Sequence, residues 1–375
     1  MWIKITPFDT LFFRTPRPFS MGADSWAELI FPPYPSTLYG AIRSFLLFRK
    51  GKLSNFYSGK LKDEYAGAVI QKKEGLEVKK GKLKIRGIFV FKGNKPIFRT
   101  PMDLVSIKGE KEEDSRKKVY LLEKISKPSF MISNYRLEDV LIWKGKDAVE
   151  AERRWIGYTD FCNYVKGNSK EFFAIKDDCI FLKEPKVGIK RDRKTLSSEE
   201  NMLYRTQMIR LKEDVSIVAE ISDMDGFPEK GVMQLGGEGR AVFFEKIDDP
   251  LKELKEADFR FENKIFKIYL ATPALFENGW IPKWINPETY EGEKEGISVK
   301  LIACAIGRPV PVGGWDLAKG KAKTLRKAVP EGSVYYFRVL NNATSEDIKR
   351  AFHFKNISDF LSEEGFGLSI LGEAV

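Results

Sequence analysis

The stretch Gln234-Leu-Gly-Gly-Glu-Gly-Arg-Ala-Val-Phe-Phe-Glu245 contains three glycines within four residues, set between two apolar runs. Glycine tolerates a positive φ and has no Cβ, so the backbone can turn sharply here and come close to another group. Backbone N–H groups exposed in such a turn can line a concavity that suits phosphate. The stretch predicts a strand, a glycine loop and a second strand. Its candidate phosphate contacts are the backbone of Gly236, Gly237, Glu238 and Gly239 and the side chain of Arg240.

Two better-known phosphate-binding loops do not fit this stretch. A P-loop requires G-x-x-x-x-G-K-[ST], and no lysine–serine or lysine–threonine pair closes the loop. A dinucleotide fingerprint needs glycine or alanine at its sixth place and a helix after it, but Val242 stands at that place and opens a strand-like run. We therefore expect no nucleotide cofactor. The alternative is a tight hairpin whose glycines serve its geometry alone, and the loop by itself leaves both interpretations open.

The composition is that of a folded globular protein. The chain has 375 residues, a length that suits two domains, with 43% hydrophobic and 13% aromatic residues. No signal-peptide pattern and no membrane-spanning apolar segment is present, so we expect a cytoplasmic protein without a membrane partner. The three cysteines (Cys162, Cys179 and Cys304) never show C-x-x-C spacing, which favours a reducing compartment over a disulfide frame or a zinc site. No metal is expected.

The charge balance favours a polyanionic partner. Lys and Arg number 64 against 53 Asp and Glu, a formal net charge of +11. Such a surplus steers nucleic acid toward a protein and strengthens binding through counterion release. The alternative is a surface rich in Lys and Glu of the kind that thermophilic proteins carry. We favour nucleic acid on the charge alone.

The N-terminal region supplies several candidate phosphate contacts. Residues 2–13 alternate in a strand-like manner, and Arg14 and Arg17 follow in a loop broken by prolines. Arginines on such a loop can contact the nucleic-acid backbone, or they can simply balance acidic neighbours. Residues 187–195 and 203–211 form the densest cationic stretch. Its candidate contacts are Lys190, Arg191 and Arg193, with Tyr204 available for base stacking.

A helix is predicted after the proline-rich segment 31–35. Ser36 and Thr37 are good N-cap residues, and an apolar stripe follows at helical spacing: Leu38, Ala41, Ile42, Phe45 and Leu46. Gly40 and Arg43 lie off that stripe and are candidate RNA contacts. Because glycine in a helix costs about 1 kcal/mol relative to alanine, we expect another backbone to approach Gly40 closely. Free N–H groups of the first turn, with Ser36 and Thr37, form a potential anion site; the alternative is that Ser36 is only a cap.

The C-terminal half has a clearer order. Strands are predicted over 265–271, 297–305, 333–340 and 368–371, with a helix over 345–352 capped by Ser345 and some helical character in 275–290. This is the β-α-β-β-α-β order of a ferredoxin-like (RRM-like) domain. Both halves end in Gly-x-Gly before a final strand, which hints at duplication. The predicted class is α+β, with two ferredoxin-like domains over 1–250 and 251–375 that carry insertions and glycine-rich loops.

Three further segments are notable. Residues 50–82 are lysine-rich and are predicted to form loops and one helix, and 108–118 is a mixed-charge run predicted to be a solvated loop. Their roles stay open. Residues 313–327 combine a glycine pair, Trp315 and a lysine cluster, a combination that suits RNA or a protein partner.

Several of these stretches together resemble a known family, the RAMP-superfamily third subunit of the type III-B CRISPR effector, the Cmr complex. The resemblance is carried by Asp9-Thr-Leu-Phe-Phe-Arg14, Arg17-Pro-Phe19, Phe31-Pro-Pro-x-Pro-Ser-Thr-Leu-Tyr-Gly-Ala-Ile-Arg43, Pro101-x-Asp103-Leu104, Val187-Gly-Ile189, Leu203-Tyr204, Leu235-Gly-Gly-Glu-Gly-Arg240, Gly313-Gly-Trp-Asp316 and Gly332-Ser-Val-Tyr-Tyr-Phe337. Each motif is weak singly, and their order over nearly the whole chain is specific.

The resemblance implies a function in antiviral defence. It implies two ferredoxin-like domains, binding of the repeat-derived 5′ tag of the CRISPR guide RNA (crRNA), and docking to the large polymerase-like subunit beside a neighbouring RAMP backbone subunit. It implies no catalysis and no catalytic residues. We therefore expect a non-catalytic RNA-binding scaffold subunit of a ribonucleoprotein.

Two alternatives come from other functional classes. A RAMP endoribonuclease that processes CRISPR precursor RNA needs a general base and acid near the 2′-OH, often His, sometimes Tyr or Lys. The sole histidine, His353, lies between Phe352 and Phe354, so a packed, partly buried ring is expected; catalysis by Tyr and Lys stays open. A nucleotide-binding enzyme that uses the Gly236 loop is the least favoured.

Overall fold

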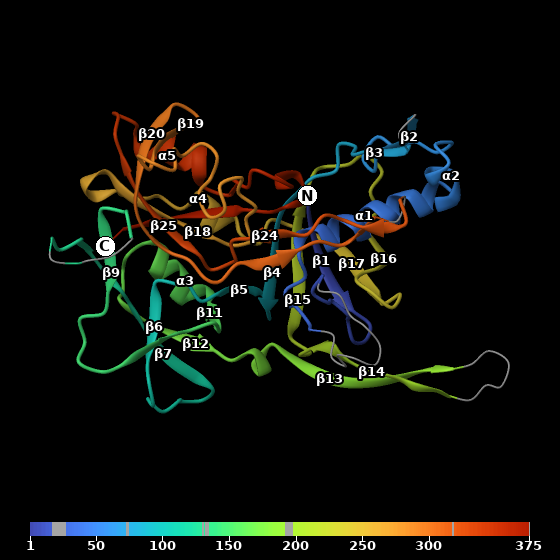
Figure 1. Ribbon diagram of the computed structural model, residues 1–375, viewed down its shortest axis with the longest axis horizontal. Coiled ribbons are helices and arrows are strands. Elements are labelled where there is room, and N and C mark those ends of the chain that lie inside the picture. The colour runs from blue at the N-terminus through green and yellow to red at the C-terminus, as the bar shows by residue number, and fades with distance from the viewer. Residues whose placement is uncertain are drawn as a thin grey trace. The chain divides into compact units, whose positions relative to one another are not determined.

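A computed structural model describes residues 1–16, 28–72, 75–129, 131, 135–191, 198–316 and 319–374, with the backbone alone at 71, 72, 75, 189–191 and 198–205. Helices and strands are mixed and strands predominate, which confirms the mixed α and β class (Figure 1). None of the helices in this described part of the chain is both long and apolar enough to cross a bilayer.

The chain forms two compact units, each assembled from separate segments. Unit 1 comprises Met1–Ile85, Ile180–Ile247 and Pro311–Arg326, and unit 2 comprises Arg86–Cys179, Asp248–Val310 and Lys327–Val375. The sequence predicted consecutive domains over 1–250 and 251–375. The compact units interleave along the chain, because strands that pair within one unit come from distant segments.

Unit 1 is built on four antiparallel strands and one long helix. The strands are β1 (Trp2–Pro7), β15 (Val215–Ile221), β16 (Lys230–Gln234) and β17 (Ala241–Ile247), in the order β15-β1-β17-β16. Helix α1 (Pro35–Lys50) buries the predicted apolar stripe, and its Phe45 ring meets Phe244 of β17 edge to face at 5.1 Å between centroids. The predicted strand–glycine loop–strand is therefore β16, its loop and β17.

Two expectations about α1 are wrong. Tyr34 is the N-cap residue and Pro35 opens the helix, so Ser36 and Thr37 lie in the first turn and Ser36 is not the cap. Proline suits this first position because its missing N–H would have no partner there anyway. Gly40 is exposed, and a Cβ at this position would meet no atom within 4 Å, so no close backbone explains the glycine.

The lysine-rich insertion has more structure than predicted. It contains α2 (Leu53–Tyr57) and a hairpin of β2 (Ala68–Lys72) and β3 (Gly75–Lys79). Two cations of α1 hold it: Lys50 Nζ lies 2.6 Å from the Asp63 carboxylate, and Arg43 Nε donates to the Ala66 carbonyl at 2.6 Å. The Arg43 guanidinium also lies over the Phe56 ring, 5.2 Å from its centroid. Arg43 therefore anchors the insertion to the helix.

Two more ribbons complete unit 1. β13 (Phe181–Arg191) and β14 (Ser198–Leu211) form a long antiparallel hairpin, with a register irregularity between Ile189 and Arg191 (Figure 1). A short hairpin pairs β22 (Trp315–Asp316) with β23 (Lys321–Ala322). Strands β21 (Val310–Val312) and β24 (Arg326–Ala328) lie at the two boundaries of the segment Pro311–Arg326, which contains this short hairpin.

The described part of unit 2 contains two large sheets besides the strand pair β8–β9. The strands of the first follow the order β10 (Val149–Ala151), β6 (Leu104–Ile107), β7 (Arg116–Leu121), β12 (Glu171–Ile175), β11 (Trp155–Gly157), β5 (Lys95–Arg99) and β4 (Ile85–Lys92). The strands of the second follow the order β19 (Glu291–Lys294), β20 (Ile297–Ala305), β25 (Val334–Val339), β18 (Ile265–Leu270), β27 (Leu368–Glu373) and β26 (Lys355–Asn356). Further elements are β8 (Glu123–Ser126), β9 (Asp139–Ile142), α3 (Tyr158–Val165), α4 (Lys252–Glu256), α5 (Ser345–Phe352), η1 (Asp177–Cys179), η2 (Glu262–Lys264) and η3 (Ser362–Glu364).

The predicted elements of the C-terminal half are largely found. Strands β18, β20, β25 and β27 and helix α5 follow the expected order. Residues 275–290 form no helix, and the cap of α5 is Thr344, which exchanges capping-box hydrogen bonds with Asp347, rather than Ser345. In unit 1 the last strand of the sheet, β17, pairs antiparallel with its first strand, β1. In the second sheet of unit 2 the last strand, β27, likewise pairs antiparallel with that sheet's first strand, β18.

The Pro101-x-Asp103 motif is a turn that leads into a buried polar network. It separates β5 from β6. The Asp103 carboxylate is fully buried and accepts hydrogen bonds from the hydroxyls of Tyr164 (2.8 Å) and Tyr336 (2.6 Å). Buried Lys267 places its Nζ 3.5 Å from the centroid of the Tyr164 ring, and burial lowers its pKa to about 8.

We expect Asp103→Ala to lower the free energy of unfolding by about 3–5 kcal/mol, because two buried hydroxyls lose their acceptor and the Lys267 ammonium loses a compensating charge. Adding Lys267→Met should restore part of the loss, since the uncompensated charge then disappears. Urea denaturation measures both. The matched control, exposed Asp258→Ala, should change stability by less than about 0.5 kcal/mol; equal losses at both aspartates would refute the assignment.

Candidate nucleic-acid interface

The glycine loop between β16 and β17 is exposed and uses the left-handed backbone region repeatedly. Leu235 N–H donates to the Arg240 carbonyl at 2.8 Å and closes the loop. Gly236, Glu238 and Gly239 have φ values of 81°, 57° and 63°. A non-glycine residue is strained at such angles, which accounts for two of the three glycines.

The loop also packs against the chain's own segment 9–13. The Gly237 N–H donates to the Phe12 carbonyl at 2.9 Å. A Cβ at Gly236 would lie 2.6 Å from that carbonyl oxygen, and a Cβ at Gly237 would lie 2.7 Å from the Phe12 ring. Close approach to the Phe12 segment therefore explains these glycines, in addition to the turn geometry that the hairpin interpretation proposed. The Gly237 N–H is already engaged, so it is no phosphate ligand in this conformation.

Charged side chains of three segments meet beside the loop. We call this group the Asp9 cluster; its members are Asp9, Glu184, Lys186, Arg210, Glu238 and Arg240. Asp9 lies between two arginines, 3.0 Å from Arg210 and 3.3 Å from Arg240. Glu238 pairs with Lys186 and lies 3.9 Å from Arg240, and Glu184 pairs with Arg210. Three cations and three carboxylates are thus interleaved on one exposed surface of unit 1.

The electrostatics of the cluster differ between its members. The Thr10 backbone N–H, together with Arg210 and Arg240, holds the pKa of Asp9 below its usual value. A hydrogen bond to Glu184 raises the pKa of Arg210 further. The Nε of Arg240 is buried and finds no acceptor in the described part of the chain. An unmet buried donor is costly, so this position favours an additional acceptor.

Part of this cluster was not predicted from the sequence. Arg240 and Glu238 were candidates, whereas Asp9, Glu184, Lys186 and Arg210 were not. Glu184 and Lys186 are two residues apart on β13, and Arg210, which pairs with Leu182, lies diagonal to Glu184 on β14. This alternation on one face of a hairpin is a readable signal once the hairpin register is known. Asp9 has no such signal, because it reaches the cluster from the far end of the chain.

The other predicted contacts are distributed over several places. The Arg14 side chain is exposed, and the Arg14 backbone forms an isolated β-bridge with Leu29. Arg43 is engaged with the insertion as described above, and Ser36, Thr37 and Gly40 lie in the first half of α1. Lys190, Arg191 and Tyr204 belong to the strands of the β13–β14 hairpin, whose side chains there are not described. Arg17 and Arg193 lie outside the described residues.

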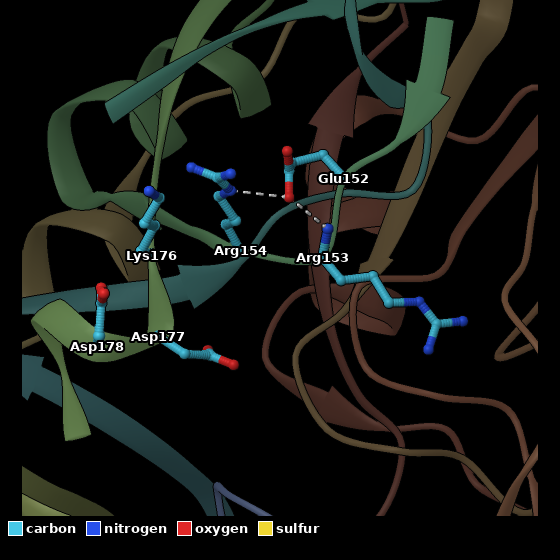
Figure 2. A pocket seen from close by; sticks show the side chains of 6 residues that line it. All are labelled: Glu152, Arg153, Arg154, Lys176, Asp177 and Asp178. Atoms are coloured by element: carbon cyan, nitrogen blue, oxygen red, sulfur yellow. Dashed lines mark hydrogen bonds and ion pairs between the residues drawn. The ribbon is translucent and has the colours of Figure 1, made fainter. Parts of the chain in front are cut away.

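Unit 2 has a polar pocket of about 410 Å³ that no motif pointed to (Figure 2). Its lining residues are Glu152, Arg153, Arg154, Lys176, Asp177 and Asp178. Figure 2 shows the Glu152 carboxylate bonded to the Arg154 side chain and to the Arg153 backbone. Glu112 pairs with Arg154 and Lys176, and Asp177 pairs with Arg99 at 2.9 Å. Arg99, Arg154 and Lys176 are thus paired with carboxylates, so we assign no ligand to the pocket.

The sole histidine is buried, as the sequence predicted. His353 is 7% exposed and packs edge to face against Phe259 and Phe354. Its Nε2 lies 2.8 Å from the Leu254 carbonyl, so it acts as donor, and its Nδ1 accepts from the Leu371 N–H at 3.2 Å. Burial lowers its pKa to about 4. Both ring nitrogens are thus committed to the backbone.

Comparisons with known proteins were consistent. The family model described as CRISPR-associated protein (Cas_Cmr3) matches residues 3–374. A search of curated proteins found no match. A chain of the Type III-B Cmr-beta complex bound to cognate target RNA and AMPPnP shares 17% identity at a TM-score of 0.50, over 90% of this chain and 86% of that chain. At that identity the likeness concerns the fold.

Two further solved structures are more distant. A chain of the Type III-B Cmr-beta complex bound to cognate target RNA has 18% identity and a TM-score of 0.47, with 90% of this chain and 86% of that chain covered. A chain of the Csm3-Csm4 subcomplex of the type III-A CRISPR-Cas interference complex has 12% identity and a TM-score of 0.34, over 92% and 95%.

We expect Gly236→Ala to destabilise the protein by about 2 kcal/mol or more, from the left-handed φ and the contact with the Phe12 carbonyl. Gly40→Ala is the matched control and should stabilise by up to about 1 kcal/mol, because it lies in open space within a helix. Urea denaturation of both variants checks the pair. Equal effects of the same sign would contradict this account of the loop.

The stability of the protein should fall as pH drops from 6.5 toward 4. In that pH range His353 is protonated in the unfolded chain but stays neutral in the folded protein, because its pKa in the folded state, about 4, lies below the unfolded value. The full loss is on the order of 3 kcal/mol. Denaturation of wild type and His353→Gln between pH 7 and pH 5, above the range of most carboxylates, isolates the effect. Parallel pH profiles of the two proteins would disprove it.

Proposed function

The chain belongs to the CRISPR-associated Cas_Cmr3 family and is a component of a type III-B Cmr effector complex, and from that premise we propose that it is a non-catalytic RNA-binding scaffold subunit. In this proposal it binds the 5′ tag of the guide RNA. It docks the large polymerase-like subunit and a neighbouring RAMP backbone subunit of the complex. The Asp9 cluster is its RNA-phosphate site.

The observation that carries the proposal is the position of Arg240. It follows the exposed glycine loop, its neighbours include the cations Lys186 and Arg210, and its buried Nε has no acceptor in the described chain. Guanidinium groups bind phosphate through charge-assisted hydrogen bonds of fixed geometry. A phosphate oxygen beside Arg240 would satisfy the unmet donor. The overall charge of +11 supports the approach of a polyanion.

The carboxylates of the cluster are compatible with this role. Asp9, Glu184 and Arg210 are about half exposed, and exposed ion pairs contribute roughly 0–1 kcal/mol each. A phosphate group can therefore replace a carboxylate at little cost. Until RNA binds, the carboxylates hold the cations in position and reduce their mutual repulsion.

The β13–β14 hairpin extends the proposed surface. Cationic residues outnumber acidic ones between its two ends. The 11 residues of β13 span roughly 36 Å at about 3.3 Å per residue, enough to follow several nucleotides of an extended strand. Lys190, Arg191 and Tyr204 remain predicted contacts along it. Arg14 remains one on the neighbouring N-terminal segment.

The state of His353 supports the absence of a histidine-based ribonuclease site. A general base must reach the 2′-OH proton directly or through one water. His353 is buried and both of its nitrogens are bonded to the backbone. The proposal requires that purified protein leave repeat RNA intact; specific cleavage, abolished by a single Tyr or Lys substitution, would favour the nuclease alternative.

We also propose that both halves derive from a ferredoxin-like ancestor. The supporting observation is that the last strand pairs with the first in two sheets, β17 with β1 in unit 1 and β27 with β18 in the second sheet of unit 2. The central order β20-β25-β18-β27 of the second sheet places its first strand inside the sheet, flanked by the third and fourth.

Replacement of both Arg210 and Arg240 by alanine should weaken binding of guide RNA and flatten its salt dependence. Loss of two phosphate contacts reduces the slope of log K against log salt by about 1.4 for a single strand. Filter-binding titrations over a range of salt concentrations measure the slope. The matched control is Lys246→Ala, which removes a cation of the same sheet that pairs with Glu229 at 2.7 Å.

The control should leave the slope unchanged. Identical slopes for wild type and the double arginine variant would remove the Asp9 cluster from the RNA site. Equal flattening by Lys246→Ala would mean that net charge alone, and no defined site, governs the affinity.

A further inference from the structure

The short β22–β23 hairpin of unit 1 presents an unusually exposed tryptophan. Trp315 is 60% exposed, and nearby Leu325 is 56% exposed. Tryptophan offers a large aromatic face that normally finds a partner, so its exposure marks a contact surface. The proposed phosphate site leaves this hairpin unused.

Positive charge predominates in the sequence that follows Trp315. Four cations follow it within the same segment of unit 1: Lys319, Lys321, Lys323 and Arg326. The segment's acidic residue is Asp316, whose carboxylate accepts from the Lys319 backbone N–H at 3.1 Å and so serves the turn. A dense cationic segment with an open aromatic ring complements a polyanion that carries planar bases.

The hairpin register places these groups. Trp315 pairs with Ala322 and Asp316 with Lys321, and the Lys323 N–H donates to the Gly314 carbonyl at 2.9 Å. Trp315 therefore shares a face with the small Ala322 side chain, which leaves the indole open. Lys321 and Lys323 project from the opposite face. The thickness of a two-stranded ribbon, about 10 Å, is comparable with a Debye length of about 8–10 Å, so the lysines still contribute positive potential on the indole face.

The hairpin is connected with the Asp9 cluster through the segment 9–16. At one end of that segment Asp9 pairs with Arg240 and the Phe12 carbonyl binds the glycine loop. At the other end a Cβ at Gly313 would lie 2.9 Å from Pro16 Cβ, so the base of the hairpin packs there. Seven residue steps span at most roughly 25 Å. Exposed Arg14 lies between the two ends, within reach of the same RNA strand.

We infer that the Trp315 hairpin is a second RNA contact, in which the indole stacks on one unpaired base while Lys321 and Lys323 neutralise adjacent phosphates. The inference rests on the proposed function for the identity of the ligand. A protein partner fits less well, because the buried centres of protein interfaces are depleted in lysine, and lysine is the commonest residue type here. The contact requires a single strand, since a base must be free to leave its own stack.

Trp315→Ala should weaken binding of single-stranded guide RNA roughly 5- to 150-fold, the equivalent of one stacked base. Trp315→Phe should retain most of the affinity, because a smaller ring still stacks. Leu325→Ala is the matched control: it removes an equally exposed apolar side chain that cannot stack, and should leave affinity within about twofold. Fluorescence anisotropy with labelled RNA measures all three, and circular dichroism verifies folding.

Two further measurements separate stacking from simple attraction. Lys321→Ala with Lys323→Ala should reduce the salt slope by about 1.4, whereas Trp315→Ala should leave the slope unchanged. With a fully duplex RNA the loss caused by Trp315→Ala should disappear. An equal loss on duplex RNA overturns the stacking contact.

The outcomes also distinguish this inference from the function it rests on. Tight RNA binding by wild type and by Trp315→Ala alike overturns the hairpin contact and leaves the proposed function standing. Parallel losses in Trp315→Ala and Leu325→Ala overturn it in favour of an apolar protein-docking surface. If wild type binds no RNA under conditions where it is folded, the inference and the proposed function fail together.

Discussion

The arrangement of the candidate site depends on one close approach, between the glycine loop and the N-terminal segment. The Gly237 N–H donates to the Phe12 carbonyl, and no Cβ fits at Gly236 beside that oxygen. This contact brings the N-terminal segment alongside β16 and β17, so that Asp9 lies between Arg210 and Arg240. The same segment carries Arg14 and then packs its Pro16 against Gly313. One hydrogen-bonded crossing thus orders groups drawn from distant parts of unit 1.

The two units use carboxylates for different purposes. Asp103 of unit 2 is fully buried, accepts from two tyrosine hydroxyls and lies near a buried lysine, so every partner is needed and none can be exchanged. Asp9 of unit 1 is exposed and pairs with arginines that solvent also reaches. Ion pairs of the second kind are weak and exchangeable. A surface that must accept and release a polyanion requires that property, and a core that must keep one arrangement requires the other.

Periodicity predicted the regular elements well. The strand over 297–305 and the helix over 345–352 have the predicted bounds, and the apolar stripe of α1 is buried. The predicted helix caps were wrong, because in each helix a neighbouring residue forms the N-terminus instead. Tyr34 and Pro35 begin α1 in place of a Ser36 cap, and Thr344 with Asp347 caps α5 in place of Ser345. The open space around Gly40 shows that a glycine within a helix does not require a closely packed neighbour.

The sequence by itself determined the mixed class, the strand–glycine loop–strand, the basic character, the burial of His353 and the family resemblance, because each depends on neighbouring residues or on composition. Only the tertiary structure decided why the glycines are needed, which cations meet, and how the segments divide between the two units. Those facts depend on pairs such as Asp9 with Arg240 and Gly313 with Pro16, which are far apart in the chain. No local pattern encodes such a distance, because burial and strand pairing across the whole unit set it.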